Sequence, residues 1–157
     1  MKFSSRTKHS GQGLVLVIII AVILLGIIWY LYSTKAATRR DAIRYGHDVI
    51  NRLVINHDRA LLDQDLGPQA KMDMPPSQRD YVIQSFTKWG VPSQPLQIED
   101  NVTFDQSFFG LISANPHGFF TAQLNYPAQP VTMQIAVSQG ATKWLIDNIT
   151  VTMQQAR

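Results

Sequence analysis

The sequence predicts an α+β protein: an N-terminal transmembrane helix, an amphipathic helix, a short helix, and a curved antiparallel sheet of about four strands. Three observations predict this class. Residues 14–32 form an uncharged apolar run, residues 36–63 repeat apolar positions at helical spacing, and from residue 96 onward apolar and polar residues alternate. The predicted divisions are a short basic cytoplasmic leader at 1–13, an anchor helix at 14–32, a juxtamembrane amphipathic helix at 33–63, and the remainder of an exported domain at 64–157.

The apolar run is long enough to cross a membrane. Its 19 residues carry no charge, and as a helix they would cover roughly 28 Å, close to the hydrocarbon thickness of a bilayer. A cleaved signal peptide would have a shorter apolar region followed by a small-x-small site, and Thr34-Lys35-Ala36 is a poor one. Aromatic residues at the C-terminal end suit the headgroup layer. We therefore expect an uncleaved anchor that includes Leu14, Ile20, Leu25, Trp29, Tyr30 and Tyr32.

The charges beside the run do not decide its orientation. Three Lys or Arg residues precede it, but Lys35, Arg39, Arg40 and Arg44 follow it. A short leader without acidic residues, set against 122 residues beyond position 35, favours an N-terminus in the cytoplasm, because long domains are translocated largely regardless of charge. We expect a single-pass protein of the inner (cytoplasmic) membrane with a periplasmic or otherwise extracytoplasmic domain.

Charge and cysteine content exclude several classes of function. Residues 1–35 hold four basic residues and no acid, whereas residues 36–157 hold the other 10 basic residues against all 11 acids. The basic pI of 9.3 therefore belongs to the N-terminus, and the rest of the chain has no excess charge to attract nucleic acid. The absence of cysteine excludes disulfides, zinc-thiolate sites and thiol catalysis.

The segment after the anchor shows a helical stripe. Its apolar and histidine positions follow a 4-3-4-3-4 spacing, which predicts a helix over residues 36–63 that is stopped by Gly67-Pro68. No proline interrupts the chain between Gly13 and Gly67, so the span can continue into this helix. Arg44, Asp48 and Arg52 can pair on its solvent side. The stripe consists of Ile43, His47, Ile50, Val54, His57 and Leu61.

A second, short helix is predicted after a looser stretch at residues 69–74. Pro75-Pro76 precedes Ser77, and Asp80 three residues later completes an acidic variant of the capping box. Gly90 fits a left-handed stop, and Pro92 prevents continuation of the helix.

The remaining chain reads as strands. They are predicted at residues 97–104, 108–113, 120–126, 131–138 and 144–153. In the last of them Trp144 and Ile146 share one parity, whereas Ile149, Val151 and Met153 share the other. One extra residue reverses side-chain alternation, so this change predicts a β-bulge at Asp147-Asn148 and a curved sheet that wraps around the amphipathic helix.

Residues 118–153, GFFTAQLNYPAQPVTMQIAVSQGATKWLIDNITVTM, form a hairpin followed by the pattern W-x-I-x-x-I-x-V. This pattern resembles the closing strands of the nuclear-transport-factor-2-like (cystatin-like) α+β cone, and the similarity in element order extends over residues 36–153. Members of that superfamily include isomerases and dehydratases. Others are non-catalytic domains carried outside a single span, among them assembly proteins of type IV secretion machines. The resemblance implies a domain of this second kind.

Type IV pilins and pseudopilins are a weaker resemblance. They share a short basic leader, a helix that continues from apolar to amphipathic, and a C-terminal sheet, and residues 9–14 are similar to a prepilin cleavage region. That family usually has glutamate at the fifth mature position, but the only glutamate of this chain is Glu99. The pilin interpretation therefore ranks below the cone.

Candidate chemistry concentrates on four residues that could line a cavity of the cone. His47 beside a carboxylate could act as an acid or base, and Asp147 could act as a base with Tyr126 as proton donor. The structural alternative places Asp147 in the bulge. His47 and His57 are ten residues apart, about 15 Å along a helix, so they cannot share a metal ion. We predict no catalytic residue, cofactor or metal; the possible cavity residues are His47, Tyr126, Trp144 and Asp147.

Two further segments complete the sequence-based interpretation. Residues Phe108, Phe109, Leu111 and Ile112 would form an interface if they lie at a loop or sheet edge, and burial under the first helix is the alternative. His117 is expected in a turn at residues 115–118.

The expected function is that of a non-enzymatic structural or assembly subunit of a membrane complex. Its partners would be the bilayer and other membrane or envelope proteins, or further copies of the chain. A tethered small-ligand binder or enzyme using the cone cavity is the first alternative, and a pilin-like subunit is the second.

Overall fold

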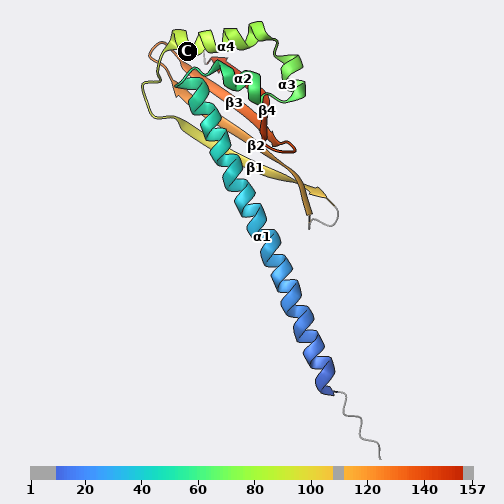
Figure 1. Ribbon diagram of the computed structural model, residues 1–157. Helices are drawn as coiled ribbons and strands as arrows, with labels where there is room; N and C mark the ends of the chain where they lie inside the picture. The colour runs from blue at the N-terminus through green and yellow to red at the C-terminus, as the bar shows by residue number, and fades with distance from the viewer. Residues whose placement is uncertain (1–9, 108–111, 154–157) are drawn as a thin grey trace, which may run out of the picture. The chain divides into compact units, whose positions relative to one another are not determined.

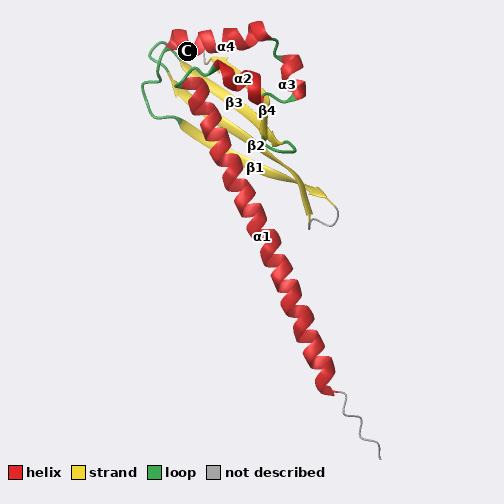
Figure 2. Cartoon of the chain, in the orientation of Figure 1, coloured by secondary structure: helices red, strands yellow, loops and turns green. Residues whose placement is uncertain are grey.

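The computed structural model describes residues 10–107 and 112–153 (Figure 1). Four helices come first and four strands follow, which confirms the predicted α+β class (Figure 2). The helices are α1 (Ser10–Val54), α2 (Arg59–Asp65), α3 (Pro68–Asp73) and α4 (Pro76–Trp89). The strands are β1 (Gln97–Ser107), β2 (Ile112–Asn125), β3 (Pro130–Gln139) and β4 (Trp144–Met153).

The chain divides after Ala37 into two compact units, and α1 contributes to both. Among the described residues, α1 is the one helix long and apolar enough to cross a membrane, as the sequence predicts. The predicted anchor side chains whose exposure is described are open to the surroundings; they are those of Ile20, Leu25, Trp29, Tyr30 and Tyr32. A helix that presents apolar side chains on every side suits a lipid environment.

The second unit contains an open antiparallel sheet with the order β1-β2-β3-β4. Phe120, Ile135 and Ile149 lie side by side in this register and are buried in one core with the helices. We call this side the inner face. The opposite, outer face carries mainly uncharged polar side chains such as Thr121 and Gln134.

The register confirms the predicted bulge in β4. Ala136 pairs with Asn148 but Val137 pairs with Ile146, so Asp147 is the extra residue. A second bulge, which the sequence analysis did not predict, lies in β2 at Asn115, whose φ is 54°. Asn tolerates this left-handed conformation better than most residues. The predicted turn at residues 115–118 is therefore wrong, because these residues belong to β2.

The amphipathic helix ends earlier than predicted. Helix α1 stops at Val54 rather than Asp63, and α2 begins at Arg59. Asp58 caps α2, since its Oδ1 accepts hydrogen bonds from the backbone N–H groups of Ala60 and Leu61. His57 lies in the intervening turn with a φ of 52°. Leu61 is nevertheless buried in the core. The apolar spacing therefore continues beyond the end of α1, and periodicity alone does not reveal that the helix is broken there.

Two other helix predictions need correction. Residues 69–74 were expected to be a looser stretch, but residues 69–73 belong to α3, with Pro68 at its first position where the missing N–H is not needed. Helix α4 begins at Pro76, and no side chain caps it; Asp80 instead accepts a hydrogen bond from Arg59 Nε at 2.5 Å. The helix does end before Gly90, whose φ of 80° is positive, but its ψ of −147° lies outside the left-handed helical region.

Strand limits also differ from the prediction in one region. Residues 112–113 and 120–125, expected in two strands, both belong to β2. β1 extends to Ser107 rather than Phe104. The last two strands, β3 and β4, match the predicted ranges to within one residue at each end.

Candidate functional site

Two of the four predicted cavity residues contact other side chains at the boundary between α1 and the sheet. His47 Nε2 lies 2.7 Å from Asp100 Oδ1 of β1, and both side chains are partly exposed. The His47 ring also meets the edge of Phe120 at a centroid distance of 6.3 Å. Trp144 stacks on Tyr45 of α1 at 6.4 Å. His47 thus has the carboxylate that the sequence interpretation required.

The other two residues lie at different positions along the sheet. Asp147 accepts a hydrogen bond of 2.9 Å from Ser138 Oγ. Tyr126 is buried against Trp89, with ring centroids 5.5 Å apart, and burial raises the pKa of its phenol to about 12. Within the described residues, no hydrogen bond, ion pair or ring contact joins any two of the four predicted cavity residues.

A row of polar side chains crosses the sheet, with Asp105 of β1, His117 of β2, Ser138 of β3 and Asp147 of β4 as its members. His117 Nε2 lies 3.2 Å from Asp105 Oδ2, and His117 is paired in register with Ser138, which donates to Asp147. The sequence analysis missed this row because its members come from four strands and His117 was expected in a turn. Nucleophilic catalysis requires a hydrogen bond between the serine and the histidine, and none joins them in the part of the chain that the structure describes.

Arginines and aspartates join the short helices to one another. Arg79 donates to Asp63 Oδ1 at 2.9 Å, and Arg59 pairs with both Asp63 and Asp80. Arg52 Nη2 donates to Asp58 Oδ2 at 2.5 Å. These contacts hold α1, α2 and α4 in place. The hydrogen bonds from Arg59 and then Arg79 hold the pKa of Asp63 below its usual range.

We expect these aspartates to make the domain sensitive to acid. The hydrogen bond from Arg52 lowers the pKa of Asp58, as the arginines do for Asp63. A carboxyl whose pKa is lower in the folded state contributes stability above its unfolded pKa of about 4 and loses it as the pH falls through the folded value. The free energy of unfolding should therefore be steady from pH 7 to about 5 and then decline.

Urea unfolding between about pH 2.5 and 7 measures this dependence. Asp58→Asn and Asp63→Asn should each make the decline shallower, and Asn at position 58 can still cap α2. A decline that is equally steep in the double variant would contradict the assignment.

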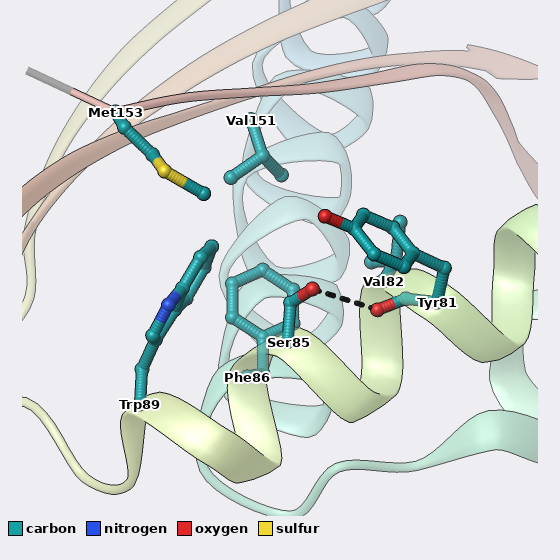
Figure 3. A pocket seen from close by; sticks show the side chains of 7 residues that line it. All are labelled: Tyr81, Val82, Ser85, Phe86, Trp89, Val151 and Met153. Carbon is teal, nitrogen blue, oxygen red and sulfur yellow. Dashed lines mark hydrogen bonds between the residues drawn. The ribbon is translucent and has the colours of Figure 1, made fainter.

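Two cavities lie between the short helices and β4. The first, of about 70 Å³, lies near the end of β4 (Figure 3). Trp89 and Met153 stand on one side of it, Tyr81 and Val82 on the other, and Phe86, Ser85 and Val151 complete its lining. Tyr81 and Met153 are 67% and 48% exposed, which is high for large apolar side chains.

The second cavity, of about 290 Å³, lies further back along β4, between that strand and the segment from Leu66 to Met74 that contains α3, with Gln78 contributed by α4. Asp73 and Gln78 contribute from the helices, and Asp147 and Ile149 contribute from β4. Gln78 of the second cavity lies about one helical turn before Tyr81 of the first, and Ile149 of the second lies two residues before Val151 of the first. The two cavities are therefore neighbours along β4. We call them together the α4–β4 groove. Of the four predicted cavity residues, only Asp147 lines it.

Aromatic packing makes one wall of this groove rigid. Trp89 lies edge-on to Phe86 at 5.6 Å and against Tyr126 at 5.5 Å. Tyr126 therefore supports a residue of the groove, although its own side chain is not part of the lining.

The predicted interface segment is mostly outside the described residues. Phe108, Phe109 and Leu111 lie there, and Ile112 is the first residue of β2. A third cavity, of about 280 Å³, lies around Phe119 and Gln134, and Phe119 is 51% exposed.

No protein-family model, no curated protein and no solved structure gives a significant match to this chain.

Proposed function

We propose that the chain is a membrane-anchored envelope protein that works by binding other proteins, as a structural or assembly subunit of a membrane complex. The observation that carries this proposal is the α4–β4 groove. Its smaller cavity, of about 70 Å³, lies well below the range of roughly 300–1,000 Å³ typical of small-molecule sites. Cavities of this size beside exposed apolar side chains suit the side chains of another protein.

The topology that we propose has one span, an N-terminus in the cytoplasm and an extracytoplasmic domain. The long apolar α1 supports the span. The order of helices and strands, together with the bulge in β4, supports a cone of the nuclear-transport-factor-2-like kind carried outside the membrane. A cone of this kind, carried by a single span, is compatible with an assembly role in a secretion-type machine.

Purification of the full chain from native membranes in mild detergent tests the proposal. We expect a second membrane or envelope protein to remain bound in a fixed ratio, as measured by mass spectrometry and by the mass of the purified particle. A strictly monomeric protein that retains no partner would count against a subunit role.

A further inference from the structure

The edge of β4 is open over most of its length. The backbone N–H of Gly67 donates to Ile146 O at 2.8 Å, and Leu66 forms an isolated parallel bridge with Ile146. The chain then turns away into α3 at Pro68. Among the described residues, no backbone group pairs with the outer edge of residues 148–153. Leu66 and Gly67 therefore pair with β4 as a fifth strand would, but only at Ile146. In the described part of the chain, no strand lies beside residues 148–153 on that edge.

The two edges of the sheet differ in charge. β1 carries Glu99, Asp100 and Asp105, and carboxylates on an edge strand oppose pairing with another chain. Residues 148–153 of β4, NITVTM, carry no charge and are rich in β-branched side chains, which favour strand pairing. The edge that is open to an added strand is therefore the one beside the groove.

The larger cavity of the groove holds two carboxylates without a cationic partner. Asp73 accepts hydrogen bonds from Gln69 Nε2, and Asp147 accepts one from Ser138 Oγ. Neither forms an ion pair with Lys or Arg within residues 10–107 and 112–153, whereas the other aspartates do so or pair with histidine. A cationic side chain from another molecule would complement both carboxylates.

The spacing of the two cavities fits an extended chain. The larger one adjoins β4 at residues 147–149 and the apolar one at residues 151–153, about four residues or 13 Å further along the strand. Residues i and i+4 of an extended strand point to the same face. A neighbouring strand could therefore direct one side chain into each cavity.

We propose that the α4–β4 groove binds an extended segment of a partner protein as a fifth strand beside β4, with a bulky apolar side chain in the smaller cavity and a Lys or Arg four positions away in the larger one. This inference rests on the proposed function, because it names the chemistry of the partner for the same groove. Main-chain hydrogen bonds to β4 supply affinity, and the two cavities supply specificity.

Binding of defined peptides to the full chain in detergent tests the inference. The probes are acetyl-TFTVTKT-amide and its reversed-order counterpart acetyl-TKTVTFT-amide, which cover the antiparallel and parallel directions. We expect one of them to bind, measured by fluorescence anisotropy of a labelled copy, and to slow amide hydrogen exchange in residues 148–153. Replacing its Lys with Glu should weaken binding at least tenfold.

Two matched variants of α4 locate the site. Ser85 and Thr87 each donate a side-chain hydrogen bond to the carbonyl four residues earlier, but only Ser85 lines the groove. Ser85→Arg should weaken peptide binding at least tenfold, and Thr87→Arg should leave it unchanged. Equal effects of the two variants, or no binding of either peptide, would overturn the inference.

The outcomes separate this inference from the proposed function. A partner that co-purifies equally with wild type and with Ser85→Arg would support the subunit role and overturn the groove as its binding site. A purified protein that is dimeric, with residues 148–153 already protected from exchange, would assign the groove to a second copy and overturn the peptide inference. Peptide binding without any co-purifying protein would support the groove and count against a stable complex.

Discussion

Gly46→Ala is expected to lower the free energy of unfolding of the domain by about 2 kcal/mol, within the range seen when a packed core receives an extra methyl group. A Cβ at position 46 of α1 would lie 2.6 Å from Cδ2 of Phe120 and closer still to two other ring atoms. The ring cannot retreat, because a Cβ at Gly118 on its strand would also lie only 2.7 Å from it. Phe120 is fully buried between these two glycines.

The sign of this change is informative because helix propensity predicts the opposite. Alanine in the interior of an exposed helix is about 1 kcal/mol more favourable than glycine. Gly26→Ala, on the same helix at a position with nothing within 4 Å, should therefore not destabilise the chain. Urea unfolding followed by tryptophan fluorescence measures both variants, and Phe120→Leu should partly rescue Gly46→Ala. A Gly46→Ala protein as stable as wild type would show that α1 does not pack on Phe120 as described.

Arg79→Met is expected to lower the free energy of unfolding by about 2–3 kcal/mol, since hydrogen bonds from a charged group are worth about 1.5–3 kcal/mol. The Arg79 side chain is buried and donates to Met74 O at 2.8 Å, to Lys71 O at 3.2 Å and to Asp63 Oδ1 at 2.9 Å. It therefore satisfies carbonyl groups at the end of α3 while it joins α4 to α2. Methionine keeps the apolar stem and removes only these bonds.

Two further substitutions test whether the guanidinium geometry matters. Arg79→Lys keeps the charge but lacks the planar fork that reaches three acceptors, so it should recover less than half of the loss. Lys88→Met removes an exposed cation from the same helix and should change stability by less than about 0.5 kcal/mol. Thermal melting in detergent compares the three variants. Arg79→Met within 0.5 kcal/mol of wild type would contradict the bridging role.

The helix that ends at Val54 shows the limit of periodicity. The spacing of Ile50, Val54 and Leu61 is compatible with one helix, and all three side chains are indeed buried. Asp58 breaks the helix because its carboxylate caps α2 and also accepts from Arg52. Asp58, which lies between two members of the apolar stripe, is the indication of this break that the sequence contains.

The candidate site was predicted only in part. Asp147 was recognised from the parity change in β4, and it does line the α4–β4 groove. Tyr81 and Trp89 lie in the predicted short helix, but neither is among the predicted site residues. Their meeting with Val151 and Met153 joins segments some seventy residues apart, and a local pattern contains no information on which helix face meets which strand edge.

The sequence by itself determined the kinds of elements and their order: a membrane-length apolar helix, short helices, and an antiparallel meander with a bulge at Asp147. These follow from local rules, because apolar length, helical spacing and two-residue alternation each act over a few neighbouring residues. Only the tertiary structure decided that Phe120 lies between two glycines, that Arg79 bridges three helices, and that Asp73 and Asp147 line one cavity. The physical reason is that packing, ion pairing and cavities depend on which distant segments meet, and the core decides this as a whole.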